Sequence, residues 1–75
     1  MKKAIRARIL LDLKNNAVAL LNEVKDFHAD LDIAEEVKGE DNDATLGRLS
    51  AAIDGLNAAV AALKEAEEGE EAKTP

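Results

Sequence analysis

Residues 10–34 read LLDLKNNAVALLNEVKDFHADLDIA, and apolar side chains recur in this stretch at alternating steps of three and four residues. The members of this row are Leu10, Leu13, Ala17, Leu20, Val24, Phe27, Leu31 and Ala34. A second row with similar spacing follows a short polar break and consists of Leu46, Leu49, Ile53, Leu56, Val60 and Leu63. Such spacing places each row along one side of an α-helix. The sequence therefore predicts two helices that pack against each other.

The expected fold is all-α, an antiparallel helical hairpin with helices over about residues 4–38 and 44–68. The intervening residues are polar, and Gly39 suits the left-handed position that follows a helix. Asn42 or Asp43 can cap the second helix by accepting a hydrogen bond from a free backbone amide. Because the first helix is the longer one, we expect its N-terminal residues to project past the end of the second. Residues 1–68 form a single domain in this interpretation, and residues 69–75 are expected to be a disordered acidic tail.

The chain of 75 residues has no cysteine and one histidine, so disulfides, thiolate metal sites and histidine metal clusters are excluded within one chain. A lone hairpin of two helices buries little apolar surface relative to the entropy lost on folding. We therefore expect a homodimer in which two hairpins form a four-helix bundle of the coiled-coil type. The expected oligomer core comprises Leu10, Leu13, Leu20, Val24, Phe27, Leu31, Leu46, Leu49, Ile53, Leu56, Val60 and Leu63.

The net charge of −6 is distributed unevenly along the chain. Residues 1–14 carry five basic side chains and one acidic one, a net charge of +4, which leaves −10 for residues 15–75. We name Lys2, Lys3, Arg6 and Arg8 the basic head and predict that it binds a protein partner. Nucleic acid is a disfavoured partner, because the acidic body repels phosphates and Phe27 is the only aromatic residue.

Away from its apolar row, the second helix carries small residues where a solvent-facing side is normally charged. Gly47, Ala51, Gly55 and Ala59 follow one another at four-residue steps. Two glycines each destabilise a helix interior by about 1 kcal/mol relative to alanine. Close approach of another helix explains these glycines, so we predict a close-packing face at these four positions. The alternative is that alanine is present only because it favours helix formation.

No catalytic or cofactor site is expected from the sequence. A calcium loop that starts at Asp41 would need glycine where Leu46 stands and glutamate where Ala52 stands. The acidic residues of the first helix are better explained as a solvated face than as magnesium ligands. His28 has no Ser, Cys or Tyr near it in sequence that could serve as a nucleophile. We therefore predict that the protein is not an enzyme and binds no metal or cofactor.

No stretch approaches the roughly 20 consecutive apolar residues that span a bilayer as a helix. Arg6, Arg8 and Asp12 interrupt any apolar core that an N-terminal signal peptide would need. We expect no membrane span and a cytoplasmic location.

The function favoured by these features is that of a non-enzymatic protein–protein interaction module. A small oligomer of this kind would act as an adaptor, an assembly factor or a minor subunit of a larger complex. The alternative is an acidic inhibitor, of the kind that phages use as antagonists, which imitates nucleic acid and blocks a basic groove. In that case, acidic residues such as Glu23, Asp26, Asp30 and Glu36 would form the binding surface.

Overall fold

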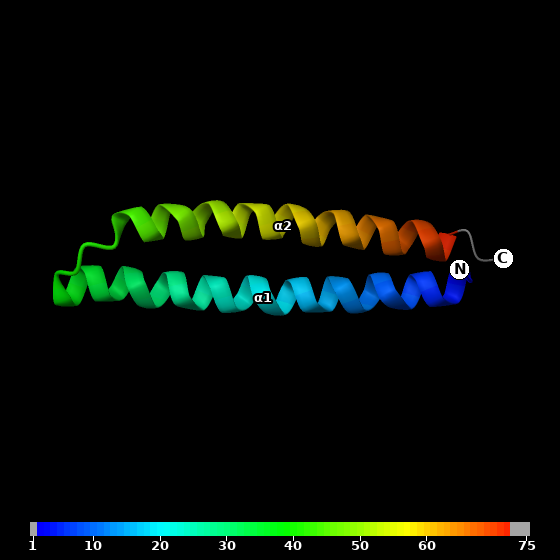
Figure 1. Cartoon of the computed structure of the whole chain (residues 1–75), viewed down its shortest axis with the longest axis horizontal. Coiled ribbons are helices and arrows are strands. Elements are labelled where there is room, and N and C mark those ends of the chain that lie inside the picture. The colour runs from blue at the N-terminus through cyan, green and yellow to red at the C-terminus, as the bar shows by residue number, and fades with distance from the viewer. Residues whose placement is uncertain (1, 73–75) are drawn as a thin grey trace.

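The computed structural model describes residues 2–72 and shows two long helices that lie side by side and antiparallel (Figure 1). Helix α1 comprises Lys3–Lys38, and helix α2 comprises Asp43–Ala72. The molecule is an elongated rod, with principal dimensions of 58 × 16 × 14 Å. The predicted all-α hairpin is confirmed. We call the end that holds the turn the loop end and the end that holds both termini the open end.

The turn between the helices is built as its sequence predicts, with one difference in the role of an asparagine. Gly39 adopts the left-handed conformation, with φ of 71° and ψ of 23°, and its N–H donates to the Glu35 carbonyl oxygen over 3.2 Å. Asn42 does not use its side chain to cap α2. Its Nδ2 donates instead to the Leu31 carbonyl oxygen of α1, also over 3.2 Å. The asparagine thus ties the turn to the first helix.

Helix α2 is longer than the sequence suggested, and this changes the position of the basic head. The helix continues through Gly69 to Ala72 instead of ending at residue 68. Glu70 forms an ion pair of 3.2 Å with Arg6, and Glu67 forms one of 3.0 Å with Lys14. These contacts hold the last turns of α2 against α1. The expectation that the basic head projects beyond α2 is therefore wrong, and residues 73–75 of the expected tail lie outside the described residues.

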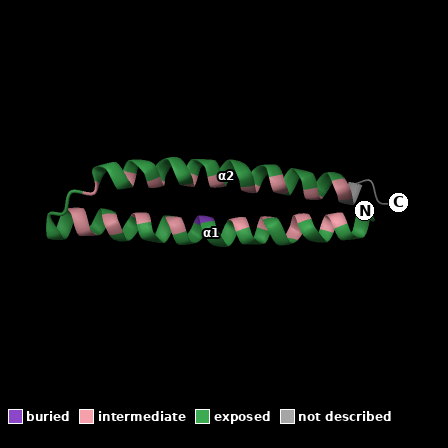
Figure 2. Cartoon of the chain, in the orientation of Figure 1, coloured by how far each residue is buried: buried purple, intermediate pink, exposed green. Residues whose placement is uncertain are grey.

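The contact between the helices follows a regular heptad pattern along the whole hairpin. Half-buried residues face the other helix and exposed residues face outward (Figure 2). The contact residues of α1 include Leu10, Lys14, Ala17, Leu21, Val24, His28 and Leu31, and those of α2 are Leu46, Leu49, Ile53, Leu56, Val60 and Leu63. Among the residues described, only Leu21 is buried, with 6% of its surface exposed. Two helices alone do not enclose a core.

The expectation that no part of the chain could span a membrane is wrong on length and composition. Within Asp43–Glu70 of α2, an 18-residue window reaches a mean hydropathy of 1.2 and contains at most two charged residues. Helix α2 has no unbroken apolar run of that length, but its abundant alanine raises the mean hydropathy of the segment around Arg48 and Asp54. A core helix in a bundle meets the same criterion, so this finding by itself does not establish insertion into a membrane.

The backbone conformation of Gly39 in the turn and of Gly47 inside α2 predicts opposite effects on stability when each glycine is replaced by alanine. G39A places a Cβ on a residue with φ of 71°, where a side chain is strained by about 1 kcal/mol or more. G47A lies inside α2, where an added Cβ meets nothing within 4 Å, and should stabilise the helix by about 1 kcal/mol. Urea unfolding at one fixed protein concentration should show a lower midpoint for G39A and a higher midpoint for G47A. Shifts in the same direction would contradict this account of the turn.

Candidate interaction surfaces

One broad side of the hairpin is apolar and uncovered. The residues one position before every second contact residue of each helix lie on this same side, because the helices run antiparallel. On α1 they are Leu13, Leu20 and Phe27, and on α2 they are Ala52, Ala59 and Ala66. Leu13, Leu20 and Phe27 are 47, 49 and 52% exposed. We call these six residues the open apolar face.

The opposite side of the hairpin is more polar, although Leu11 and Val18 of α1 also lie on it. The polar residues there that lie at or beside the contact include Lys14, Lys25, Asp32 and Glu35 of α1 and Lys64 and Glu67 of α2. The six residues of the open apolar face carry no charge, although Glu23 and Asp30 of α1 share the heptad row of Ile9 along its outer edge. The two sides of the same hairpin therefore differ in chemistry, and the open apolar face is the one suited to further packing.

The predicted oligomer core thus divides into two sets. Leu10, Val24 and Leu31, together with the six residues predicted on α2, lie in the contact between the helices of one chain. Leu13, Leu20 and Phe27 lie outside this contact, and Leu21 and His28 take positions there that the sequence reading had not assigned. The sequence feature that could have identified Leu21 as a contact residue is its seven-residue spacing from Lys14 and His28, which are polar. A role for Leu13, Leu20 and Phe27 in an oligomer core stays a prediction.

The predicted close-packing face of α2 is exposed in the hairpin. Gly47, Ala51, Gly55 and Ala59 all lie away from α1, and a Cβ added at either glycine meets nothing within 4 Å. The four residues also spiral around α2, so only Ala59 belongs to the open apolar face. Within the described chain, no helix packs on these positions.

The basic head is partly engaged in ion pairs within the chain. Arg6 pairs with Glu70 across the two helices, and Arg8 pairs with Asp12 one turn away over 3.3 Å. Lys2 is exposed ahead of α1, and Lys3 is exposed in its first turn. The structure therefore places the four residues at the open end beside the acidic end of α2.

A small apolar hollow adjoins the basic head at the open end of the hairpin. Its volume is about 220 Å³, and Arg6, Ile9, Leu10 and Glu70 line it. These residues come from the same side of the hairpin as the open apolar face. Arg6 Nε is buried and has no hydrogen-bond partner among the described residues. The hollow thus combines apolar walls with the Arg6–Glu70 ion pair.

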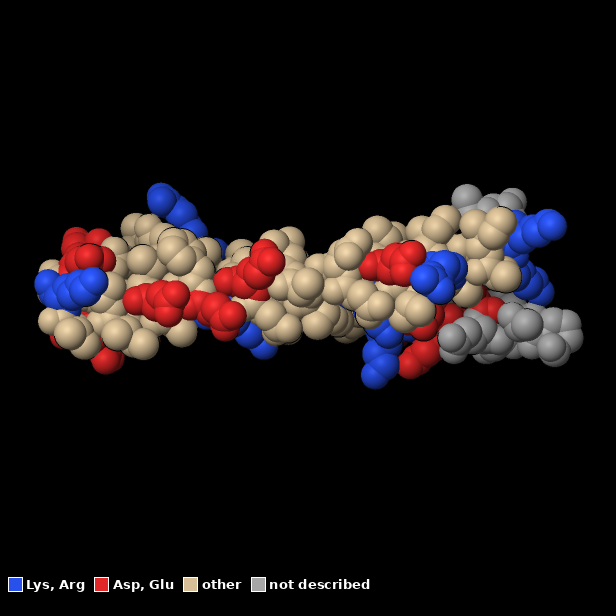
Figure 3. Space-filling view, turned by 90° about the horizontal axis from the view of Figure 1, so that it is seen from below, with Lys and Arg blue, Asp and Glu red and all other residues tan. Residues whose placement is uncertain are grey.

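The middle of the hairpin is free of charge on all sides. Residues 15–22 of α1 and residues 55–63 of α2 contain no Lys, Arg, Asp or Glu, and the antiparallel arrangement sets these segments side by side. Figure 3 shows the corresponding uncharged band between acidic and basic side chains. Residues 23–54, at the loop end, carry ten acidic and three basic side chains. The open end, residues 2–14 and 64–72, carries six basic and six acidic ones.

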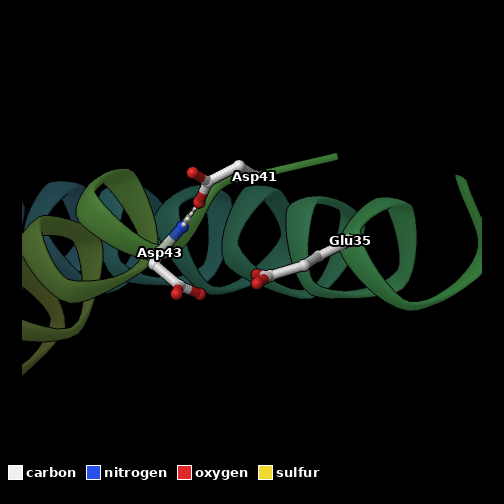
Figure 4. A group of neighbouring side chains, drawn as sticks. All are labelled: Glu35, Asp41 and Asp43. Atoms are coloured by element: carbon white, nitrogen blue, oxygen red, sulfur yellow. Dashed lines mark hydrogen bonds between the residues drawn. The ribbon is translucent and has the colours of Figure 1, made fainter. Parts of the chain in front are cut away.

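Three carboxyl groups meet at the turn. Glu35 of α1, Asp41 of the loop and Asp43 of α2 approach one another with oxygen atoms within 4.8 Å (Figure 4). The side-chain hydrogen bond between Glu35 and Asp43 raises the pKa of Glu35 from 4.5 to about 7, and burial and the charges of Asp43, Asp41 and Asp32 act in the same direction. Neighbouring negative charges favour the protonated form of a carboxyl group.

The structure also brings His28 to Ser50 of α2, at 3.2 Å between Nε2 and Oγ. Twenty-two residues separate the two in sequence, so local spacing gave no indication of this pair. The pair is a polar contact between the two helices.

Comparison with family models, with curated proteins and with solved structures finds no match to this chain. Its function is therefore inferred from the surfaces described above.

The raised pKa of Glu35 predicts how stability depends on pH. Between pH 4.5 and about 7, the folded hairpin keeps a proton on Glu35 that the unfolded chain releases. The free energy of unfolding should therefore fall as pH rises through this range. Replacement of Glu35 by Gln (E35Q) keeps a hydrogen-bonding group without the charge and should reduce this fall, measured as the urea midpoint at pH 5 and pH 8. E36Q removes the exposed neighbouring carboxylate and should leave the fall unchanged; equal effects of the two variants would contradict the prediction.

Proposed function

We propose that the protein is a non-enzymatic interaction module that works as a homodimer, with two hairpins combined in a four-helix bundle. The observation that carries the proposal is the open apolar face: three large side chains about half exposed, beside a row of alanines, in a structure whose described residues include a single buried one. Isolated apolar residues are normal on protein surfaces, but a continuous apolar strip marks a binding surface.

The dimensions of the face suit a stable interface. The hairpin is 58 Å long and 16 Å across. A specific protein–protein interface buries about 800 Å² on each partner. One hairpin laid on this side of another covers an area of that order. The total accessible surface of one chain is 5338 Å², so the remaining surface stays free for a further partner.

A bundle of this kind would serve as an adaptor, an assembly factor or a minor subunit of a larger complex. Lys2 and Arg8 of the basic head support this role because they are exposed and are not part of the open apolar face. A dimer carries two such heads. Each head offers charged groups to a protein partner, without the aromatic residues that stack on nucleic-acid bases.

The distribution of charge supports a second function, that of an acidic inhibitor. Ten of the sixteen acidic residues lie at the loop end, between residues 23 and 54, and only three basic residues accompany them. A target with a basic groove would bind this end through exposed charges. At about 1 M salt the screening length falls to roughly 3 Å. Such a complex would then dissociate, whereas association through the open apolar face would persist.

Single substitutions on the open apolar face should abolish self-association. L20D and F27D each place a charge where the partner hairpin packs, and burying an unpaired charge costs several kcal/mol. Light scattering over a concentration series should give a dimer for the wild type and a monomer for both variants. V18D is the matched control, because Val18 is 36% exposed on the other side of α1. This variant should remain dimeric.

Two results would count against the dimer. A wild-type protein that stays monomeric at every concentration would contradict it. Binding of that monomer to phospholipid vesicles, lost in L20D and F27D, would assign the same face to a lipid surface instead. Circular dichroism of each variant would establish that loss of association is not loss of helix.

A further inference from the structure

The open apolar face leaves two arrangements of a symmetric dimer. In one, the two loop ends lie together; in the other, the hairpins are reversed, and the loop end of each covers the open end of its partner. Both arrangements cover Leu13, Leu20 and Phe27. The features at the two ends of the face differ, and these features distinguish the arrangements.

We infer that the second copy docks in the reversed arrangement, with the Val37 side chain of each copy seated in the Arg6–Ile9–Leu10–Glu70 hollow of the other. The inference rests on the proposed homodimer and adds its geometry. The docking surface runs from this hollow at the open end, along the open apolar face, to Val37 at the loop end.

The first argument is the match between a protruding side chain and a hollow. Val37 is 76% exposed, more than any other large apolar residue described. On the heptad pattern of α1, Val37 and Ile9 occupy equivalent positions, since 28 residues separate them. Both therefore lie along the same edge of the open apolar face, at opposite ends of the helix. Reversal of one copy brings Val37 toward the partner's hollow, whereas the other arrangement sets hollow against hollow.

The second argument is electrostatic. The loop end carries seven more acidic than basic side chains, while the described residues of the open end carry equal numbers of the two. Two loop ends placed together would concentrate negative charge at one end of the dimer. Reversal separates these ends by the length of the molecule and brings each basic head to an acidic loop end.

The seating of Val37 also determines the register of the reversed dimer. Val37 opposite Ile9 places the two-fold axis midway between these residues, near residue 23 of α1. Leu20 of each copy then lies opposite Phe27 of the other.

The test is a distance measurement on the intact chain, which has no native cysteine. Glu40 is exposed in the loop, so E40C can carry a spin label. In the reversed dimer, the two labels lie at opposite ends and should be separated by close to the 58 Å length of the hairpin. A mixed dimer of E40C and R8C chains should show a short distance between labels.

Each outcome bears on a different proposal. A wild-type dimer with a short distance between two E40C labels would overturn this inference and leave the homodimer intact. A protein that forms no dimer would overturn both.

V37D should weaken dimerisation at least about tenfold, because burial of a valine contributes about 1.5 kcal/mol or more and 1.4 kcal/mol corresponds to a factor of ten. I33D alters a residue that is 59% exposed away from the face and should not weaken dimerisation; equal losses would also overturn the inference.

Discussion

A helix that contacts one neighbour can bury only the side that faces it, and this constraint governs the whole hairpin. The apolar side of α1 is wider than α2 can cover, because apolar residues occupy both the contact positions and the positions just before them. Leu21 is consequently the single buried residue among those described, while Leu13, Leu20 and Phe27 stay about half exposed. The uncovered strip follows from the geometry of two helices, not from a defect in their packing.

Polar contacts determine which side of α1 faces α2. Lys14 pairs with Glu67, His28 contacts Ser50, and the Glu35 carboxyl group hydrogen-bonds Asp43. Each pair joins the two helices at the edge of their contact, along the polar side of the hairpin. Charged and polar residues at heptad positions specify pairing more than they add stability. In this chain they match α1 to α2 and leave the open apolar face unoccupied.

The sequence predicted the two helices, the turn at Gly39 and the α2 contact row, since periodicity and turn chemistry are local signals. It did not predict which side of α1 faces α2. The row of Leu13, Leu20 and Phe27 is more apolar than the row of Lys14, Leu21 and His28, so hydrophobicity alone predicts that the first row faces α2. In the structure the second row faces α2, because Lys14 and His28 meet polar partners there. These partners lie far away in sequence, and only the register of the hairpin brings them into contact.

Abundant alanine explains two unusual properties of helix α2, its high mean hydropathy and its small exposed residues. An alanine row beside a row of large residues gives a face with a ridge on α1 and a shallow strip on α2. Helices that meet through alanines approach one another closely, while Leu and Phe fill the wider space between the longer side chains. A lipid surface needs no such difference between the two helices. The pairing of a bulky row with a small row on one face therefore favours a protein surface as the partner of the hairpin.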